Sequence, residues 1–319
     1  MRAKSYITLE NLETTEVFEN SPLNFQIEKI EVPNLFTSKP IGSYHLYNNQ
    51  KYLATVGEYY TPTQPIELYK KAQDIYNRQK SAGVDVKFNK GAVREDGKLI
   101  EFAMDWPVNS EPVAGDTIKY EIIISSGNDG KKPLAINIFG FRLICENGMT
   151  VPERIAGARR RHSRDGLLNL EATSFAEIVN DSIQHFNATL SQMAKVKLEY
   201  KDASELLDKI LTTANKSTAP EGQQKVSKIA QKHKDAILSL YADNDGGAIP
   251  EIRNSAYALY NAVTNYVDHH APLRSTTTRE QYVNGRGELY KQTALDIILE
   301  YGKSRAGAAV LDDILNGGK

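Results

Sequence analysis

The sequence is poor in cysteine and tryptophan, with one of each among its 319 residues. Its single cysteine, Cys145, cannot form an internal disulfide, which favours a reducing, cytoplasmic compartment. Long apolar runs are also missing, since no stretch approaches the roughly 18 residues that a membrane span requires. The first twenty residues contain no apolar segment typical of a signal peptide. We therefore expect a cytoplasmic protein with no membrane partner.

An excess of charge of either sign is lacking as well. The chain has 39 Lys and Arg against 40 Asp and Glu, a formal net charge of -1. This balance excludes a uniformly basic polymer-binding protein, so any contact with nucleic acid requires a local basic patch.

Sequence motifs of the common enzyme classes are absent: there is no Walker A loop, no G-x-G-x-x-G and no G-x-S-x-G. The only histidine cluster is Asp268-His269-His270, and adjacent side chains on a helix diverge too far to converge on one ion. A Cys145 thiolate with His162 as its base remains an alternative, although cysteine on an apolar strand is usually an inert small hydrophobe. We expect a binding protein without metal or cofactor rather than an enzyme.

Alternation of apolar and polar residues predicts an antiparallel meander of about four strands. The strands are expected at residues 84–89, 100–106, 118–125 and 134–144. Glu95-Asp96-Gly97 and Asn128-Asp129-Gly130 supply turns, because glycine accepts the positive φ of a tight hairpin. Upstream, the sequence predicts a hairpin over 44–56 with its turn at 48–50, and then a helix over 66–80.

From Ser174 onward the pattern is helical. Ser174 and Glu177 form a capping box for a long helix, and further helices are expected to begin near residues 204, 226, 250, 289 and 306. The predicted fold class is α+β, with an antiparallel β-meander and flanking helices in the N-terminal half and a helical C-terminal half. We expect three regions: an acidic N-terminal arm over 1–40, an α+β core with the sheet and long helix over 41–200, and a helical region over 201–319.

The sharpest local feature is a basic island in the connection between the predicted sheet and the long helix. Its candidate nucleic-acid-binding residues are Lys131, Lys132, Arg154, Arg159, Arg160, Arg161, His162 and Arg164. Guanidinium groups bind phosphate bidentately, and a sheet that carries aromatic side chains beside such an island suits single-stranded nucleic acid. The alternative is a solvated loop whose arginines pair with Glu153, Asp165 or Glu171.

Two other features have both a functional and a structural interpretation. The stretch 191–234 is weakly basic, and its lysines indicate either a binding surface or an ordinary solvated helix face. The tyrosine-rich helix at 256–266 is either an interface, since tyrosine is enriched at interaction hot spots, or part of the core.

Three stretches resemble a known family when they are taken together. They are 53–65, 141–149 followed by His162, and 256–270 followed by 289–294. They resemble the phage/plasmid-like proteins grouped as domain of unknown function 932, over roughly residues 50–300. The resemblance implies a phage or mobile-element protein in the cytoplasm of a host cell. It also marks Arg142, Cys145, Asn147 and His162 as matching the family pattern, which adds Arg142 to the candidate nucleic-acid-binding residues.

We expect the protein to bind single-stranded DNA. The more specific expectation is that it anneals DNA strands in phage recombination or replication. A β-meander followed by a long helix resembles the core of phage single-strand annealing proteins of the RecT and Erf type. That resemblance implies a homo-oligomer, a ring or a filament, in which many modest basic patches combine. The alternative is a non-enzymatic interaction protein that acts against host defence through the tyrosine-rich helix.

Overall fold

The structure is a computed structural model that describes residues 6–34, 36–37, 40–143, 148–150, 158–167, 175–214, 228–243, 249–271 and 286–306. The chain forms two compact units. The first comprises residues 1–108, 120–138 and 156–179, and the second comprises 109–119, 139–155 and 180–319. The fold class is α+β, as predicted, with antiparallel sheets in the N-terminal half and helices in the C-terminal half.

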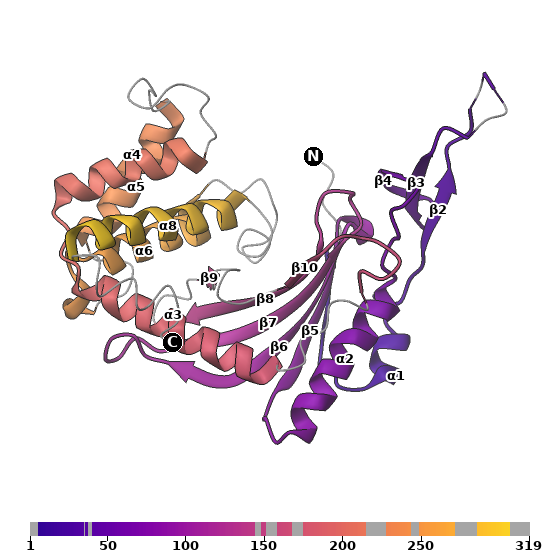
Figure 1. Cartoon of the computed structure of the whole chain (residues 1–319), viewed down its shortest axis with the longest axis horizontal. Helices are drawn as coiled ribbons and strands as arrows, with labels where there is room; N and C mark the ends of the chain where they lie inside the picture. Colours follow the sequence, from indigo (N-terminus) through magenta and orange to yellow (C-terminus); the bar gives the residue numbers. More distant parts are fainter. Residues whose placement is uncertain are drawn as a thin grey trace. The chain divides into compact units, whose positions relative to one another are not determined.

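The larger sheet has the strand order β1-β5-β6-β7-β8-β10, and β9 also pairs with β8 (Figure 1). The strands are β1 Tyr6–Glu10, β5 Lys87–Arg94, β6 Leu99–Ser110, β7 Ile118–Gly127, β8 Leu134–Arg142, β9 Gly148–Thr150 and β10 Ala158–Arg160. Strands β5 to β8 are neighbours in chain order, which confirms the predicted meander. The first of them starts at Lys87 rather than Val84, because the Val84 N–H donates to Gln79 O and closes the preceding helix.

Strand β1 lies in the segment that was expected to be an extended arm. It pairs antiparallel with β5, from Tyr6 opposite Arg94 to Glu10 opposite Lys90. The meander leaves one side of β5 with unpaired backbone groups, and an alternating segment such as Tyr6–Glu10 satisfies them. A short helix, α1 Thr15–Glu19, follows β1.

A second sheet of three strands has the order β2-β3-β4 and is drawn in indigo in Figure 1. Its strands are β2 Ile27–Glu31, β3 Ser43–Asn48 and β4 Lys51–Gly57, so the predicted hairpin is confirmed. Asn49 and Gln50 have φ of 44° and 68°, the positive values that a tight two-residue hairpin requires.

Aromatic rings form the core of the first unit. Phe18 stacks on Tyr69 at a centroid distance of 4.3 Å, and Phe102 meets the edges of Phe18, Tyr69 and Phe88 at 5.7–6.0 Å. Tyr69 comes from α2, Pro65–Ser81, which begins with a capping box between Gln64 and Glu67.

Helices form most of the second unit. They are α3 Phe175–Lys195, whose first five residues belong to the first unit, α4 Tyr200–Ala214, α5 Lys228–Asp243, η2 Pro250–Ile252, α6 Ala256–Asn265, η3 Tyr266–His270 and α8 Arg286–Ala306. Helix α8 packs against α4 and α6, and α5 packs against the same two helices. The helix expected from residue 250 begins at Ala256 instead, because the Ser255 side chain accepts the Ala258 N–H and caps it there. Ser174 and residues 307–319 lie outside the described residues.

None of the helices that the structure describes is both long and apolar enough to cross a bilayer.

Phe102→Ala tests the aromatic core of the first unit. Because Phe102 is fully buried among three rings, we expect the free energy of unfolding to fall by about 3–5 kcal/mol. Urea denaturation followed by the fluorescence of Trp106, the sole tryptophan, measures this. Phe36→Ala is the matched control, since Phe36 is 94% exposed and its loss should change stability by no more than about 0.5 kcal/mol. Equal effects of the two substitutions would contradict the prediction.

Candidate functional site

The His162 side chain joins three segments of the first unit. Its ring is only 8% exposed and stacks on Tyr60 at a centroid distance of 4.8 Å. Its Nε2 lies 3.0 Å from Lys132 O, and its Nδ1 lies 3.3 Å from Thr63 Oγ1. A neutral ring satisfies both contacts, with Nε2–H donating to the carbonyl and Nδ1 accepting the threonine hydroxyl. We call Tyr60, Thr61, Thr63, Lys132 and His162 the His162 junction.

Backbone and phenol contacts complete this junction. The Thr61 N–H donates to His162 O at 3.1 Å, and the Tyr60 hydroxyl donates to Gly127 O at 2.8 Å. Burial, reinforced by the nearby charge of Asp129, raises the pKa of Tyr60 well above its usual range, so its hydroxyl remains a donor. The segment after β4 is therefore fixed to both the β7–β8 turn and the loop after β10.

The turn between β7 and β8 depends on a glycine. A Cβ at Gly127 would lie 2.4 Å from Lys132 Cβ, so only glycine allows the two sides of the turn to approach this closely. Asp129 Oδ1 accepts the N–H groups of Lys131 and Lys132, each at 2.9 Å. These contacts determine where the two lysines leave the turn and where the Lys132 carbonyl meets His162.

Strand β10 brings the arginines of the predicted island to the same region. Arg159 lies opposite Ala135 and Arg160 lies opposite Leu134, at the edge of the larger sheet. The loop that follows returns over Leu134, since a Cβ at Gly166 would lie 3.3 Å from Leu134 Cδ1. The structure thus gathers six predicted residues, which we call the basic surface: Lys131, Lys132, Arg159, Arg160, Arg161 and Arg164.

The basic surface is accessible and carries an excess of positive charge. Lys132 is half-buried, and the other five side chains are exposed. The same segments contribute three acidic residues, which are Glu58, Asp129 and Asp165. Within the residues that the structure describes, Arg161 and Arg164 make no ion pair, so neither forms the expected alternative pair with Asp165. Glu153, Glu171 and the predicted Arg154 lie outside the described residues.

The arginines of β10 do not all point the same way. Successive residues of a strand face opposite sides of a sheet, so Arg160 shares the face of Leu134 whereas Arg159 shares the face of Ala135. Both residues lie on the strand that ends the sheet, and both side chains are exposed.

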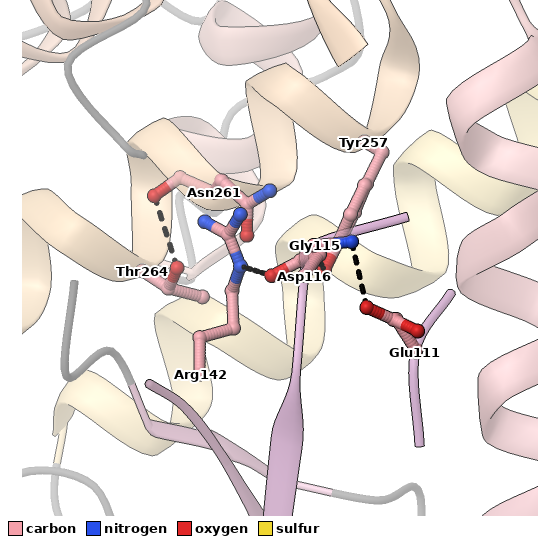
Figure 2. Close-up of polar contacts among 7 residues, drawn as sticks. All are labelled: Glu111, Gly115, Asp116, Arg142, Tyr257, Asn261 and Thr264. Atoms are coloured by element: carbon pink, nitrogen blue, oxygen red, sulfur yellow. Dashed lines mark hydrogen bonds and ion pairs between the residues drawn. The ribbon is translucent and has the colours of Figure 1, made fainter. Parts of the chain in front are cut away.

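Arg142 does not belong to the basic surface, and its prediction as a nucleic-acid ligand is wrong. It is fully buried in the second unit, where its Nε donates to Asp116 Oδ1 at 2.6 Å. The Tyr257 hydroxyl donates to Asp116 Oδ2 at 2.7 Å, and Figure 2 shows Asn261 beside the guanidinium. Arg142 therefore neutralises a buried carboxylate. Its partner lies 26 residues away, at a separation from which the sequence offers no signal.

The aromatic residues of the meander and of α6 are mostly buried. The meander rings Phe88, Phe102, Trp106, Tyr120 and Phe139 are buried, so this sheet presents none of them as a stacking face. Tyr257, Tyr260 and Tyr266 are at most 8% exposed, so they pack in the core and do not form the interface of the alternative function.

Catalytic and metal-binding alternatives gain no support from the described residues. Cys145 and Asn147 lie outside them, and both ring nitrogens of His162 are already engaged by Thr63 and Lys132. Asp268 is buried in a contact with Lys291, whereas His269 and His270 are exposed. Across the part of the chain that the structure describes, no three His, Cys, Asp or Glu side chains gather in a group that could hold a metal ion.

The lysines of the weakly basic stretch 191–234 include several that are paired with carboxylates. Lys234 is 8% exposed and lies 2.7 Å from Asp208, Lys209 contacts Glu300 at 3.2 Å, and Lys201 lies 3.9 Å from Glu205. These contacts favour the structural interpretation of this stretch.

Together, the fold and the site define a mixed α+β protein with a basic edge on its first unit. The family model described as Domain of unknown function (DUF932) matches residues 52–286, and the chain belongs to this family. No curated protein and no solved structure matches the chain.

His162 makes the stability of the first unit sensitive to pH. Burial lowers the pKa of His162 from 6.5, and the Lys132 carbonyl and the Asp129 charge oppose this only in part. Because the folded pKa lies below the unfolded one, the contribution of His162 to stability is complete above about pH 6.5 and is lost as the pH falls towards the folded pKa. Unfolding free energies measured across this range should decline less steeply for His162→Gln than for the wild type. His269→Gln, at an exposed position, should retain the wild-type slope; a wild-type slope in His162→Gln would contradict the assignment.

Arg142→Met tests the buried pair of the second unit. The substitution leaves the Asp116 carboxylate buried without its cation, so we expect the free energy of unfolding to fall by about 3–5 kcal/mol. Urea denaturation followed by the helical circular dichroism signal measures this. The double variant Asp116→Asn/Arg142→Met should recover a large part of the loss, because Asn keeps an acceptor for the Tyr257 hydroxyl without the charge. An unaltered stability in Arg142→Met would rule out this role.

Proposed function

We propose that this protein binds single-stranded DNA through the basic surface of its first unit. The observation that carries the proposal is the His162 junction, which fixes the lysine turn and the arginine loop to each other. Six cationic side chains from two separate segments therefore meet at one sheet edge. Arginine is well suited to phosphate because its planar donors match two phosphate oxygens at once.

The charge balance of the chain fits local binding of this kind. A net charge of -1 gives little general attraction to a polyanion, so the affinity has to come from the basic surface. Each phosphate contact releases a counterion, and six contacts on a single strand give a slope of log K against log salt of roughly -4. Strong salt dependence is therefore the signature of the proposed mode of binding.

We further propose that this binding serves the recombination or replication of a phage or mobile element, and that the process it assists is the annealing of complementary strands. Membership of the DUF932 family supports it only through the resemblance described above. A homo-oligomeric ring or filament in the host cytoplasm would join many basic surfaces into one continuous track, which raises avidity without new contacts. This role requires no catalytic step and no cofactor.

The triple variant Arg159→Ala/Arg160→Ala/Arg161→Ala tests the proposed surface. With three phosphate contacts removed, we expect weaker binding to a labelled single-stranded oligonucleotide and a salt slope smaller in magnitude by about 2. Fluorescence anisotropy at several salt concentrations measures both quantities.

The matched control removes the same charge from the second unit, through Lys201→Ala/Lys209→Ala/Lys232→Ala at exposed positions of α4 and α5. It should bind like the wild type. Binding with an unchanged salt slope in the arginine variant would overturn the assignment of the surface, and the absence of binding by the wild type at low salt would overturn the function.

A further inference from the structure

Tyr59 presents an exposed aromatic ring at the base of the His162 junction. It occupies the turn after β4, which the Tyr60 N–H closes by donating to Gly57 O at 3.2 Å. Its side chain is 88% exposed, whereas the next residue, Tyr60, is held by the stack on His162. The two adjacent tyrosines thus have opposite environments: Tyr60 anchors the turn and Tyr59 faces solvent.

The backbone around Tyr59 is fixed on both sides. Lys29 Nζ donates to Glu58 O at 2.5 Å and to Tyr60 O at 2.8 Å, and Thr61 is bonded to His162 O. A ring on a backbone that is already ordered loses little additional freedom when a ligand stacks on it. Tyrosine also has only two side-chain torsions, which keeps the ordering penalty small.

Tyr59 is linked to the basic surface by a short route through the chain and one hydrogen bond. Only Tyr60 separates it from Thr61, which is hydrogen-bonded to His162, and Arg161 directly precedes His162. Bond lengths along this route limit the Tyr59–Arg161 Cα separation to about 18 Å. A stacked strand rises about 3.4 Å per nucleotide, so roughly five nucleotides span that distance. One short strand can therefore meet both residues.

We propose that Tyr59 selects unpaired strands by stacking on a base whose phosphates lie along the basic surface. This inference rests on the proposed function and adds its basis for strand selectivity. In a duplex both faces of each base are covered by its neighbours, whereas a single strand can turn one base onto the ring. Phosphate contacts alone do not distinguish sequences and give little reason to prefer one strand form.

Tyr52, another exposed aromatic residue of the first unit, is less suited to this role. Tyr52 is 51% exposed, but its ring contacts His45 and Tyr47 and its hydroxyl bonds Thr55 Oγ1. The Thr55 side chain lies on the face of β4 opposite Val56, and Val56 is the residue that faces Gly130 of the lysine turn. The Tyr52 cluster therefore points away from that turn.

The test compares three labelled probes of equal length: an oligothymidine, an abasic phosphodiester strand and a duplex. Wild-type protein should bind the oligothymidine most tightly. Tyr59→Ala should lose about fivefold to a hundredfold in affinity for the oligothymidine, with an unchanged salt slope and unchanged affinity for the abasic strand. Tyr59→Phe keeps the ring and should bind like the wild type, as should Phe36→Ala at another exposed aromatic position.

The outcomes separate this inference from the proposed function. Salt-dependent wild-type binding with equal affinity for the oligothymidine and the abasic strand would overturn the stacking role and leave the basic surface in place. Wild-type affinity for oligothymidine in Tyr59→Ala would do the same. If the wild type binds neither strand at low salt, the proposed function fails, and the inference fails with it.

Discussion

A buried neutral imidazole is the contact on which the arrangement of the first unit's basic edge depends. His162 reaches Thr63, 99 residues earlier in the chain, and Lys132, 30 residues earlier. With its stack on Tyr60, it joins three segments that are distant in the sequence. A charged ring could not accept the Thr63 hydroxyl at Nδ1, so the same low-dielectric surroundings that lower the pKa also preserve the contacts. These contacts of His162 therefore determine where the surrounding cations lie.

The positive charges of the chain belong to two physically different groups. Arg94 and Arg142 are buried with Glu101 and Asp116 respectively, and Lys291 is buried with Asp268. A buried charge requires a partner, because removal of either member leaves the other in a medium that cannot solvate it. The cations at the sheet edge and in the lysine turn lie at the surface, where Lys132 is half-buried and the others are exposed. The overall count of 39 basic against 40 acidic residues therefore combines two groups of charges. Buried ion pairs stabilise the fold, and surface charges can contact a ligand.

Local features of the sequence predicted most of the first unit's elements. Strict alternation located β6 and β7, and the Asn48–Gln50 turn located the β3–β4 hairpin, because both depend on neighbouring residues. Pairing between distant segments could not be predicted: β1 joins β5 across about 80 residues, and Arg142 is buried because Asp116 is its partner. The candidate arginines of the loop were found by their density in the sequence. No comparable local pattern marks Tyr59, since its exposure depends on how Tyr60 packs against a histidine about 100 residues later.

The last turn of the α6 segment, η3, is a π-helix, in which Ala271 N–H donates to Tyr266 O at 2.7 Å, five residues back. Such a turn accommodates one more residue than an α-helix over the same length. It leaves Asp268 buried beside Lys291 and His269 and His270 exposed. The number of residues in this turn is therefore required for the contact between Asp268 and Lys291. Deletion of one residue here would restore α-helical spacing, rotate the carboxylate away and leave Lys291 without its counter-ion, although every side chain of the pair would still be encoded.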